Sequence, residues 1–327
     1  MARRVKNGLR ALVVAGALAV ALLVGWLAGG WYLPGPLGKD TAFIVPKGAG
    51  LVRISSELER QGAIRSAEAF RIRARVLGGR GVIKSGEFAL PAGASPARVL
   101  AILQSGQVIR RFVAVPEGMP AILVVEKLMA EPLLTGAVDV PREGSILPDS
   151  YDFVRGESRA AVLARMQAAM DRTLRELWAG RSANTVAKTP QEAVVLASIV
   201  EKETGKPEER RMVAGLYSNR LRIGMPLQAD PTIIYPITRG KPLGRRILQS
   251  EIAAVNDYNT YSMRGLPKGP ITNPGRDSIA AVLNPAKTDA LYMVADGTGG
   301  HQFSTTLEQH NAAVAKWFAL RRARGEL

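Results

Sequence analysis

The sequence has no cysteine and only two histidines, His301 and His310, and both scarcities limit its chemistry. Without cysteine it can form no disulfide, no thiol nucleophile and no thiolate metal site. Two histidines also argue against a histidine-rich metal centre. We interpret His301 as a structural residue at a strand start and His310 as a helix-surface residue. A metal hydrolase using both is the weakest alternative, and we expect no metal and no cofactor.

Acidic residues are scarce relative to basic ones. Lys and Arg number 44 against 28 Asp and Glu, which gives a formal net charge of +16. Four basic residues lie in the first ten positions, so the remainder carries about +12. Inside a cell this excess would suggest a nucleic acid, whereas outside the membrane the available polyanions are lipid headgroups and cell-wall polymers. A generally basic, solvated surface is the simpler alternative, and charge alone selects no substrate.

Charge is absent between Ala11 and Gly38, directly after the four basic residues. As a helix, Ala11 to Tyr32 would span about 33 Å, enough to cross a bilayer. Positive residues before the span keep the N-terminus in the cytoplasm, and Trp26, Trp31 and Tyr32 suit the far interface. We therefore predict a cytoplasmic tail (1–10), a transmembrane helix (11–32) and a linker (33–40).

A cleaved signal peptide is the alternative to this anchor. The small residues Ala28, Gly29 and Gly30 could form its cleavage site, whereas Ala15-Gly16-Ala17 lies too early in the apolar run. With the anchor, everything after Lys39 lies outside the cytoplasm.

Three short segments share a pattern of strand, Pro-x-Gly turn and amphipathic helix. The strands and turns fall at 43–48, 88–93 and 112–118, and their helices at 52–61, 96–104 and 121–131. A further helix is expected at 67–77. Strand, two helices and strand from Phe43 to Leu90 would make a small α+β module.

The pattern of predicted secondary structure changes beyond Val140. Residues 145–153 read as a turn-rich stretch with aromatics, and 224–275 as a loop-rich region. We expect helices at 159–178, 190–204, 207–221, 277–283 and 306–324, and a strand pair at 291–295 and 301–304. The chain has 327 residues, of which 47% are hydrophobic, enough for the core of one large domain or of two smaller ones. The predicted fold class is α+β.

The most informative stretch runs from Ala197 to Gly205, an apolar helix that ends with two glutamates. Both an apolar surrounding and a helix C-terminus disfavour an ionised carboxyl, and a carboxyl that stays protonated is what general-acid catalysis requires. Glu201 shares a helix face with Ala197 and Ser198, small residues that leave space for a ligand. Glu203 lies on a bulkier face and would support it. The alternative is an ordinary charged helix end, neutralised by neighbouring Lys and Arg.

Polar loops follow the glutamates. Leu227 to Thr232 carries amide and carboxylate groups, and Asp257 to Tyr261 combines hydrogen-bonding and aromatic side chains. Two rigid loops, 265–271 and 273–275, come next. Aromatic rings beside Asn, Gln and Asp suit a sugar, which offers apolar faces and many hydroxyls. Each segment alone could be a structured surface loop.

These motifs resemble one family. The segments ASIVEKET, NRLRIGMPLQADPTIIY, YNTY, GLPKGPITNPG and LYMVADGTGGHQFSTTLEQHN are similar to those of the YceG-like endolytic murein transglycosylases. The resemblance covers most of the chain. It implies a transmembrane anchor, a small LysM-like α+β module at 41–110 and a mixed α+β catalytic domain at 111–327.

The resemblance also implies a function. Enzymes of this family cleave peptidoglycan between N-acetylmuramic acid and N-acetylglucosamine without water, leave 1,6-anhydro ends and are thought to terminate nascent strands. The implied partners are glycan strands and peptidoglycan synthases, with no nucleic acid. The implied location is the inner membrane, crossed once, with the catalytic domain in the periplasm.

The family's catalytic glutamate falls on Glu201, which would donate a proton and then recover one. Ser198 and Glu203 are its expected supporting residues. The expected sugar contacts are Asn219, Gln228, Asp230, Tyr258, Asn259 and Tyr261. Two alternatives stay open: a hydrolytic muramidase, for which Asp230 would be the second carboxylate, and a wall-binding scaffold without activity.

Overall fold

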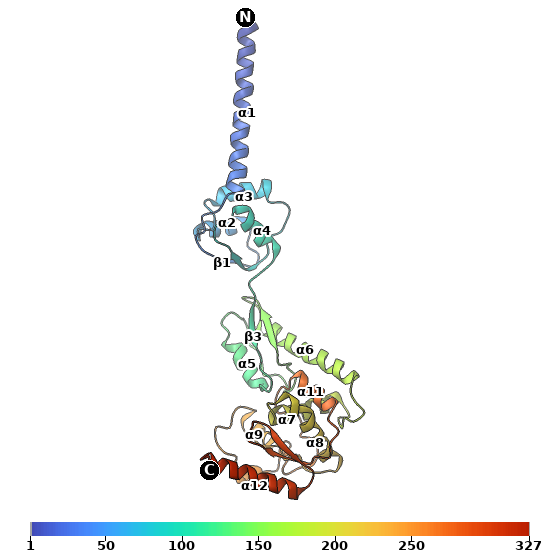
Figure 1. Cartoon of the computed structure of the whole chain (residues 1–327). Coiled ribbons are helices and arrows are strands. Elements are labelled where there is room, and N and C mark those ends of the chain that lie inside the picture. Colours follow the sequence, from blue (N-terminus) through green and yellow to red (C-terminus); the bar gives the residue numbers. More distant parts are fainter. Residues whose placement is uncertain (1, 327) are drawn as a thin grey trace. The chain divides into compact units, whose positions relative to one another are not determined.

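The computed structural model describes residues 2–326, shown as a ribbon in Figure 1. By internal contacts the chain divides into two compact units, Met1–Arg111 and Phe112–Leu327. Both combine helices with short antiparallel or paired strands, so the predicted α+β class is confirmed.

The first unit contains two strands and four helices. They are α1 (Ala2–Tyr32), β1 (Thr41–Val45), α2 (Leu51–Arg60), α3 (Ala67–Leu77), β2 (Gly86–Leu90) and α4 (Pro96–Ser105). The strands pair antiparallel, with Phe43 opposite Phe88. Both phenylalanines are buried in the core that the helices cover. The predicted order of strand, two helices and strand is therefore present, and the likeness to a LysM module stays a prediction.

Helix α1 contains the apolar stretch Leu12–Tyr32, which is long and apolar enough to cross a membrane. Its large side chains are exposed as far as Trp26. Trp31, however, is only 2% exposed and packs against Phe70, with ring centroids 5.7 Å apart. The expectation that Trp31 lies at a membrane interface is wrong, because this side chain belongs to the core of the first unit.

The second unit begins within β3, at Phe112, and carries most of the helices of the described residues. Its elements are β3 (Arg111–Ala114), α5 (Ala121–Ala130), β4 (Ser150–Phe153), α6 (Arg159–Ala179), α7 (Pro190–Glu203), a short 3₁₀ turn η1 (Pro207–Glu209), α8 (Arg210–Arg222), α9 (Pro231–Thr238), α10 (Gln249–Ile252), α11 (Arg276–Leu283), β5 (Tyr292–Ala295), β6 (His301–Ser304) and α12 (Leu307–Ala323). Strands β3 and β4 pair with each other, as do β5 and β6.

Three parts of this unit differ from the sequence-based expectation; one is the short helix α10 (Gln249–Ile252), in a region expected to be loop. Residues 150–153 were expected to be a turn-rich stretch, but they form β4 because β3 offers them a partner. Residues 231–238 were expected to be loop, but they form α9, which Pro231 begins at the first turn.

Helix α7 lies at the centre of the second unit. The Thr189 hydroxyl accepts a hydrogen bond from the Glu192 backbone N–H at 3.1 Å, and the Glu192 carboxylate accepts one from the Lys188 N–H at 2.6 Å. These bonds satisfy N–H groups that a helix start leaves without partners. Residues 193–200 are all buried, and the helix packs against α8 and α11. Burying each large apolar side chain contributes about 1.5–3 kcal/mol, so the last turn of α7 is held firmly.

Candidate active site

The last turn of α7 carries Glu201 and Glu203 on different sides. Each helical residue turns about 100°, so two residues apart means about 200°. The helix ends there because Thr204 is extended, with φ −136°. The two carboxyl groups therefore meet different parts of the unit.

Glu201 lies in a network of charged and backbone groups. Its Oε2 accepts a hydrogen bond from the Gly275 N–H at 2.9 Å, and its Oε1 is 3.7 Å from Nη2 of Arg210. The Glu201 side chain is only 5% exposed. The Arg210 guanidinium also contacts Glu117 at 2.7 Å and Asp277 at 3.3 Å. The guanidinium and the N–H both stabilise a negatively charged carboxylate, and the network ties α7 to the start of α11 and to the loop after β3.

The small residues beside Glu201 do not leave space for a ligand. Ala197 and Ser198 are fully buried. The Ser198 hydroxyl donates to the Val195 carbonyl at 2.7 Å and accepts from the Ile271 N–H at 3.0 Å. The loop 265–275 thus packs on this face of α7. The expectation of an open face at Glu201 is wrong, and Ser198 fastens that loop to the helix.

Glu203 faces a cavity of about 350 Å³ on the other side of α7. The cavity is lined by Lys202, Glu203, Leu216, Tyr217, Arg220, Gln228, Asp230, Pro231, Tyr261 and Met293. Three of the expected sugar contacts, Gln228, Asp230 and Tyr261, are therefore gathered here, around Glu203 and not around Glu201.

The surroundings of Glu203 favour its protonated form. Its pKa is raised from 4.5 to about 7, mainly by burial and also by the negative charge of Asp230, while the Tyr217 hydroxyl and Arg220 oppose the rise. Its Oε1 is buried and has no hydrogen-bond partner in the described part of the chain. Glu203 is thus a carboxyl that can hold a proton near neutral pH.

Asp230 and Tyr261 form a pair at the cavity, since the Tyr261 hydroxyl donates to Asp230 Oδ1 at 2.6 Å. The buried hydroxyls of Thr232 and Thr260, 2.9 Å apart, join their two segments. Gln228 has a positive φ of 54°, an uncommon conformation for a residue with a side chain, and its N–H donates to the Thr260 carbonyl at 3.1 Å. Such strain persists where the surroundings fix the backbone.

Three other expected sugar contacts have structural roles. Asn259 is fully buried and donates to the carbonyls of residues 251, 252 and 254. Asn219 donates to the carbonyls of Thr288 and Ala290 at 2.7 and 3.1 Å. Tyr258 packs against Tyr235, with ring centroids 4.9 Å apart. None of the three lines the cavity at Glu203, because their polar groups or rings hold the surrounding loops.

Sequence reasoning missed Tyr217 and Arg220. They are three residues apart and so share a face of α8. Tyr217 lines the same cavity as Glu203 and opposes the rise of the Glu203 pKa. Arg220 donates to the carbonyls of Leu291 at 2.7 Å and Leu227 at 2.5 Å. The sequence did contain a feature that could have identified them, because Tyr217 and Arg220 are polar residues on one face of the helix that follows α7.

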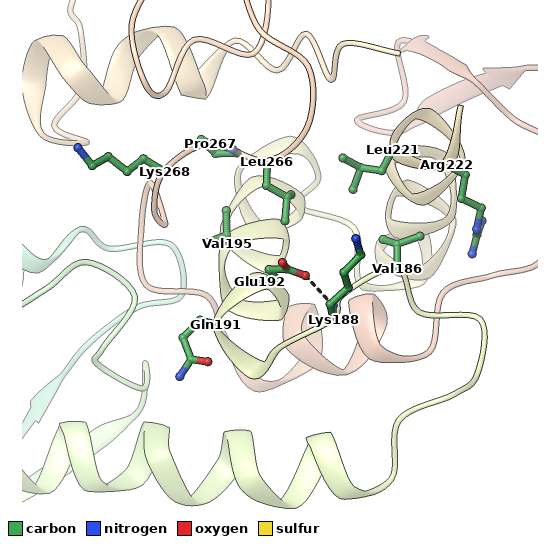
Figure 2. A pocket seen from close by; sticks show the side chains of 10 residues that line it. All are labelled: Val186, Lys188, Gln191, Glu192, Val195, Leu221, Arg222, Leu266, Pro267 and Lys268. Atoms are coloured by element: carbon green, nitrogen blue, oxygen red, sulfur yellow. Dashed lines mark hydrogen bonds between the residues drawn. The ribbon is translucent and has the colours of Figure 1, made fainter. Parts of the chain in front are cut away.

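A larger cavity, of about 720 Å³, lies at the opposite end of α7 (Figure 2). It contains the contact between Lys188 and Glu192 that caps the helix start. Neither Glu201 nor any expected sugar contact lines it. The smaller cavity remains the better candidate, because it combines a carboxyl of raised pKa with polar groups that converge on one space.

The two histidines lie elsewhere in this unit. His301 begins β6, as expected, and its Nδ1 is 2.8 Å from Glu209 Oε2. His310 lies on α12 and stacks on Tyr292, with ring centroids 5.2 Å apart. Each histidine thus has a packing or hydrogen-bonding role.

Comparison with known proteins places the chain among cell-wall enzymes. A sequence model of the YceG-like family matches residues 43–316. The endolytic murein transglycosylase of Bacillus subtilis (strain 168) is 28% identical over 334 residues, which cover 90% of this chain and 91% of that protein. A Streptococcus pneumoniae endolytic murein transglycosylase is 35% identical over 180 residues, 53% of this chain but only 32% of that relative.

A solved structure is also similar. The YceG-like protein of Listeria monocytogenes is 25% identical, and the superposition has a TM-score of 0.53 over 84% of this chain and 98% of that one. The likeness extends over nearly all of the Listeria protein, so the two share a fold.

Proposed function

The chain belongs to the YceG-like family, and on that premise we propose that it is an endolytic murein transglycosylase, a lyase that cleaves peptidoglycan glycan strands. The names of its relatives in Bacillus and Streptococcus support this function. The observation that carries it within the molecule is the cavity at Glu203, where a carboxyl of raised pKa meets polar and aromatic side chains.

We propose Glu203 as the catalytic acid and base, in place of Glu201. Glu203 lines the cavity with its polar neighbours, whereas Glu201 does not line it and has its two oxygens beside a guanidinium and an N–H. A general acid must carry a proton at the working pH and must reach the substrate. Glu201 then acts as a positioning residue, which holds the last turn of α7 and the loop before α11.

The proposed reaction breaks the bond between N-acetylmuramic acid and N-acetylglucosamine. Glu203 gives its proton to the glycosidic oxygen while the bond from that oxygen to muramyl C1 breaks. The resulting carboxylate takes the proton from the muramyl C6 hydroxyl, whose oxygen bonds to C1 and closes a 1,6-anhydro ring. No water is consumed, so one carboxyl suffices, whereas most hydrolases need two.

The other groups of the cavity bind and orient the sugar. Asp230 Oδ1 accepts the hydrogen bond from Tyr261, so Oδ2 can accept a hydrogen bond from a sugar hydroxyl. Gln228 offers an amide with both donors and an acceptor. Tyr217 lines the cavity with Glu203 and opposes the rise of its pKa. These roles leave the proton transfers to Glu203.

The proposed setting is the inner membrane. Helix α1 would cross it once, with the N-terminus in the cytoplasm and both units in the periplasm. The module at 41–110, which we propose to be LysM-like, would then stand next to the membrane, and the catalytic domain at 111–327 would reach nascent glycan strands beside the synthases.

Mass spectrometry of the products tests the proposal. Purified glycan strands digested with the protein should yield 1,6-anhydro-muramyl ends, and the variant Glu203→Gln should yield none. Reducing muramyl ends would instead identify a hydrolytic muramidase. No cleavage by wild type, together with retained binding to sacculi, would indicate a wall-binding scaffold.

A further inference from the structure

The first unit contains a second polar cavity, far in sequence from the glutamates. It measures about 350 Å³ and opens where the end of α1 meets α3 and α4. Among the residues that line it are Trp26, Gly30, Arg65, Ser66, Arg73 and Pro96. Two of the lining residues are arginines and none is acidic. The cavity therefore carries a positive charge that no lining carboxylate balances.

Arg73 is fixed at the wall of this cavity. Its Nη2 donates to the Trp26 carbonyl at 3.0 Å, and its Cζ is 4.2 Å from the centroid of the Trp26 ring. Its Nε is buried without a hydrogen-bond partner in the described residues. A Cβ at position 30 would lie 2.2 Å from Arg73 Cζ, so only Gly30 lets the guanidinium pack against α1. The carbonyl and ring of Trp26 thus hold the Arg73 guanidinium in place at the wall of the cavity.

Two helix starts add to the positive potential. Ser66 caps α3 and Ser95 caps α4, and both Ser66 and the first residue of α4, Pro96, line the cavity. The N-terminal end of a helix carries a partial positive charge, which remains here although Pro96 has no N–H and the two serine hydroxyls already accept the Ala69 and Arg98 N–H groups. The two helix starts and the two arginines therefore all favour an anion in one space.

The position of the cavity along α1 indicates where this anion comes from. From Leu12 to Gly30 the helix rises about 27 Å, close to the thickness of a bilayer core. Trp26 is 46% exposed just before that level, as expected for an aromatic residue at a membrane interface. If α1 spans the membrane, the cavity opens at the depth of the lipid headgroups.

We propose that this cavity binds the phosphate of an anionic phospholipid headgroup, with Arg65 and Arg73 as its ligands. The inference rests on the membrane anchoring proposed above and not on the catalytic activity. Guanidinium groups bind phosphate oxygens through paired charged hydrogen bonds, and both arginines line the cavity, with Arg73 held in place by Trp26. The bound headgroup would hold the first unit against the membrane surface.

Lipid titrations monitored by native mass spectrometry test the proposal with the full chain in neutral detergent. The probes are dihexanoyl phosphatidylglycerol, dihexanoyl phosphatidylcholine and inorganic phosphate. We expect one saturable phosphatidylglycerol adduct and weaker binding of the other two. Arg65→Ala and Arg73→Ala should each weaken that adduct about fivefold. Gly30→Ala should also weaken it while keeping every charge, because it displaces the Arg73 guanidinium.

Arg75→Ala is the matched control, since Arg75 is an exposed arginine of the same helix that does not line the cavity. It should leave the affinity for phosphatidylglycerol unchanged. Equal binding of the two lipids, inorganic phosphate binding as tightly as phosphatidylglycerol, or equal losses in Arg75→Ala and Arg73→Ala would each overturn the proposal.

Cleavage of isolated glycan strands separates this inference from the proposed enzyme function. The arginine variants should cleave at the wild-type rate. A wild-type protein that cleaves strands but binds both lipids alike refutes only the headgroup site. One that binds phosphatidylglycerol selectively but cleaves nothing refutes only the enzyme.

Discussion

Glu201 and Glu203 are two residues apart on α7, yet the two sides of the helix give them opposite surroundings. On one side, Glu201 meets the Arg210 guanidinium and the Gly275 N–H, at 3.7 and 2.9 Å. On the other, Glu203 lines a cavity with Asp230 and Tyr217, and its pKa is raised to about 7. Glu201 joins α7 to the loop before α11 and to Arg210, whereas Glu203 faces a cavity and has a raised pKa.

The position of a carboxyl group at a helix end therefore does not by itself determine its contacts or its function. Both glutamates share the apolar helix and its negative end, so these two factors cannot distinguish them. Residues from other segments distinguish them: Arg210 and Gly275 lie beside Glu201, and Asp230 lies near Glu203. Four predictions follow that test the comparison.

The largest expected effect is on catalysis. Glu203→Gln should lower kcat by about 10²–10⁴-fold, the usual contribution of a general acid, because the amide cannot donate the acidic proton. Glu201→Gln should lower kcat by clearly less than Glu203→Gln does, because Glu201 acts only through positioning. The release of 1,6-anhydro-muramyl products measures both rates.

An exchange of these two results would contradict the assignment of the catalytic role to Glu203. An inactive Glu201→Gln that remains folded, beside an active Glu203→Gln, would return the catalytic role to Glu201. Circular dichroism and thermal unfolding of each variant exclude loss of the fold as the cause.

The second prediction concerns the free energy of unfolding and the side of α7 that carries Glu201. Arg210 is 10% exposed at its side chain and contacts three carboxylates. Arg210→Met should cost about 3–5 kcal/mol, because it leaves the buried Glu201 carboxylate without its cation. Urea unfolding measures the loss. Arg211→Met is the control, since Arg211 is exposed and should change stability by less than about 1 kcal/mol.

Much of the fold was predictable from local patterns. Thr189, Pro190 and Glu192 marked the start of α7, and the apolar run set its length. The site was predictable only in part. Gln228, Asp230 and Tyr261 were predicted as sugar contacts of Glu201, and the structure gathers them in a cavity lined by Glu203. Small residues at Ala197 and Ser198 suggested an open face, and only the packed loop around Ile271 shows that this face is closed.

A third prediction concerns stability and pH. The folded-state pKa of Glu203 is about 7, above its ordinary value of 4.5. Its stabilising proton is therefore fully bound below pH 4.5 and lost as the pH rises through 7. Glu203→Gln has no such loss, so relative to wild type it should be more stable at pH 8, by at most about 3 kcal/mol.

Thermal or urea unfolding at pH 4 and pH 8 measures the difference. Glu143, whose pKa is also raised to about 7, titrates in both proteins and cancels in the comparison. A difference that is the same at both pH values would show that the Glu203 carboxyl titrates normally.

The smallest expected effect is a shift in the pH dependence of cleavage. The acid must be protonated, so the rate should fall as the pH rises through the pKa of Glu203. Asp230 raises that pKa by repulsion and the Tyr217 hydroxyl lowers it. Asp230→Asn should therefore move the alkaline limb to lower pH and Tyr217→Phe should move it to higher pH, each by about one unit or less. Shifts in opposite directions would identify the titrating acid as the carboxyl between these two groups. Glu201 contacts neither Asp230 nor Tyr217, so an acid at Glu201 predicts no shift in either variant.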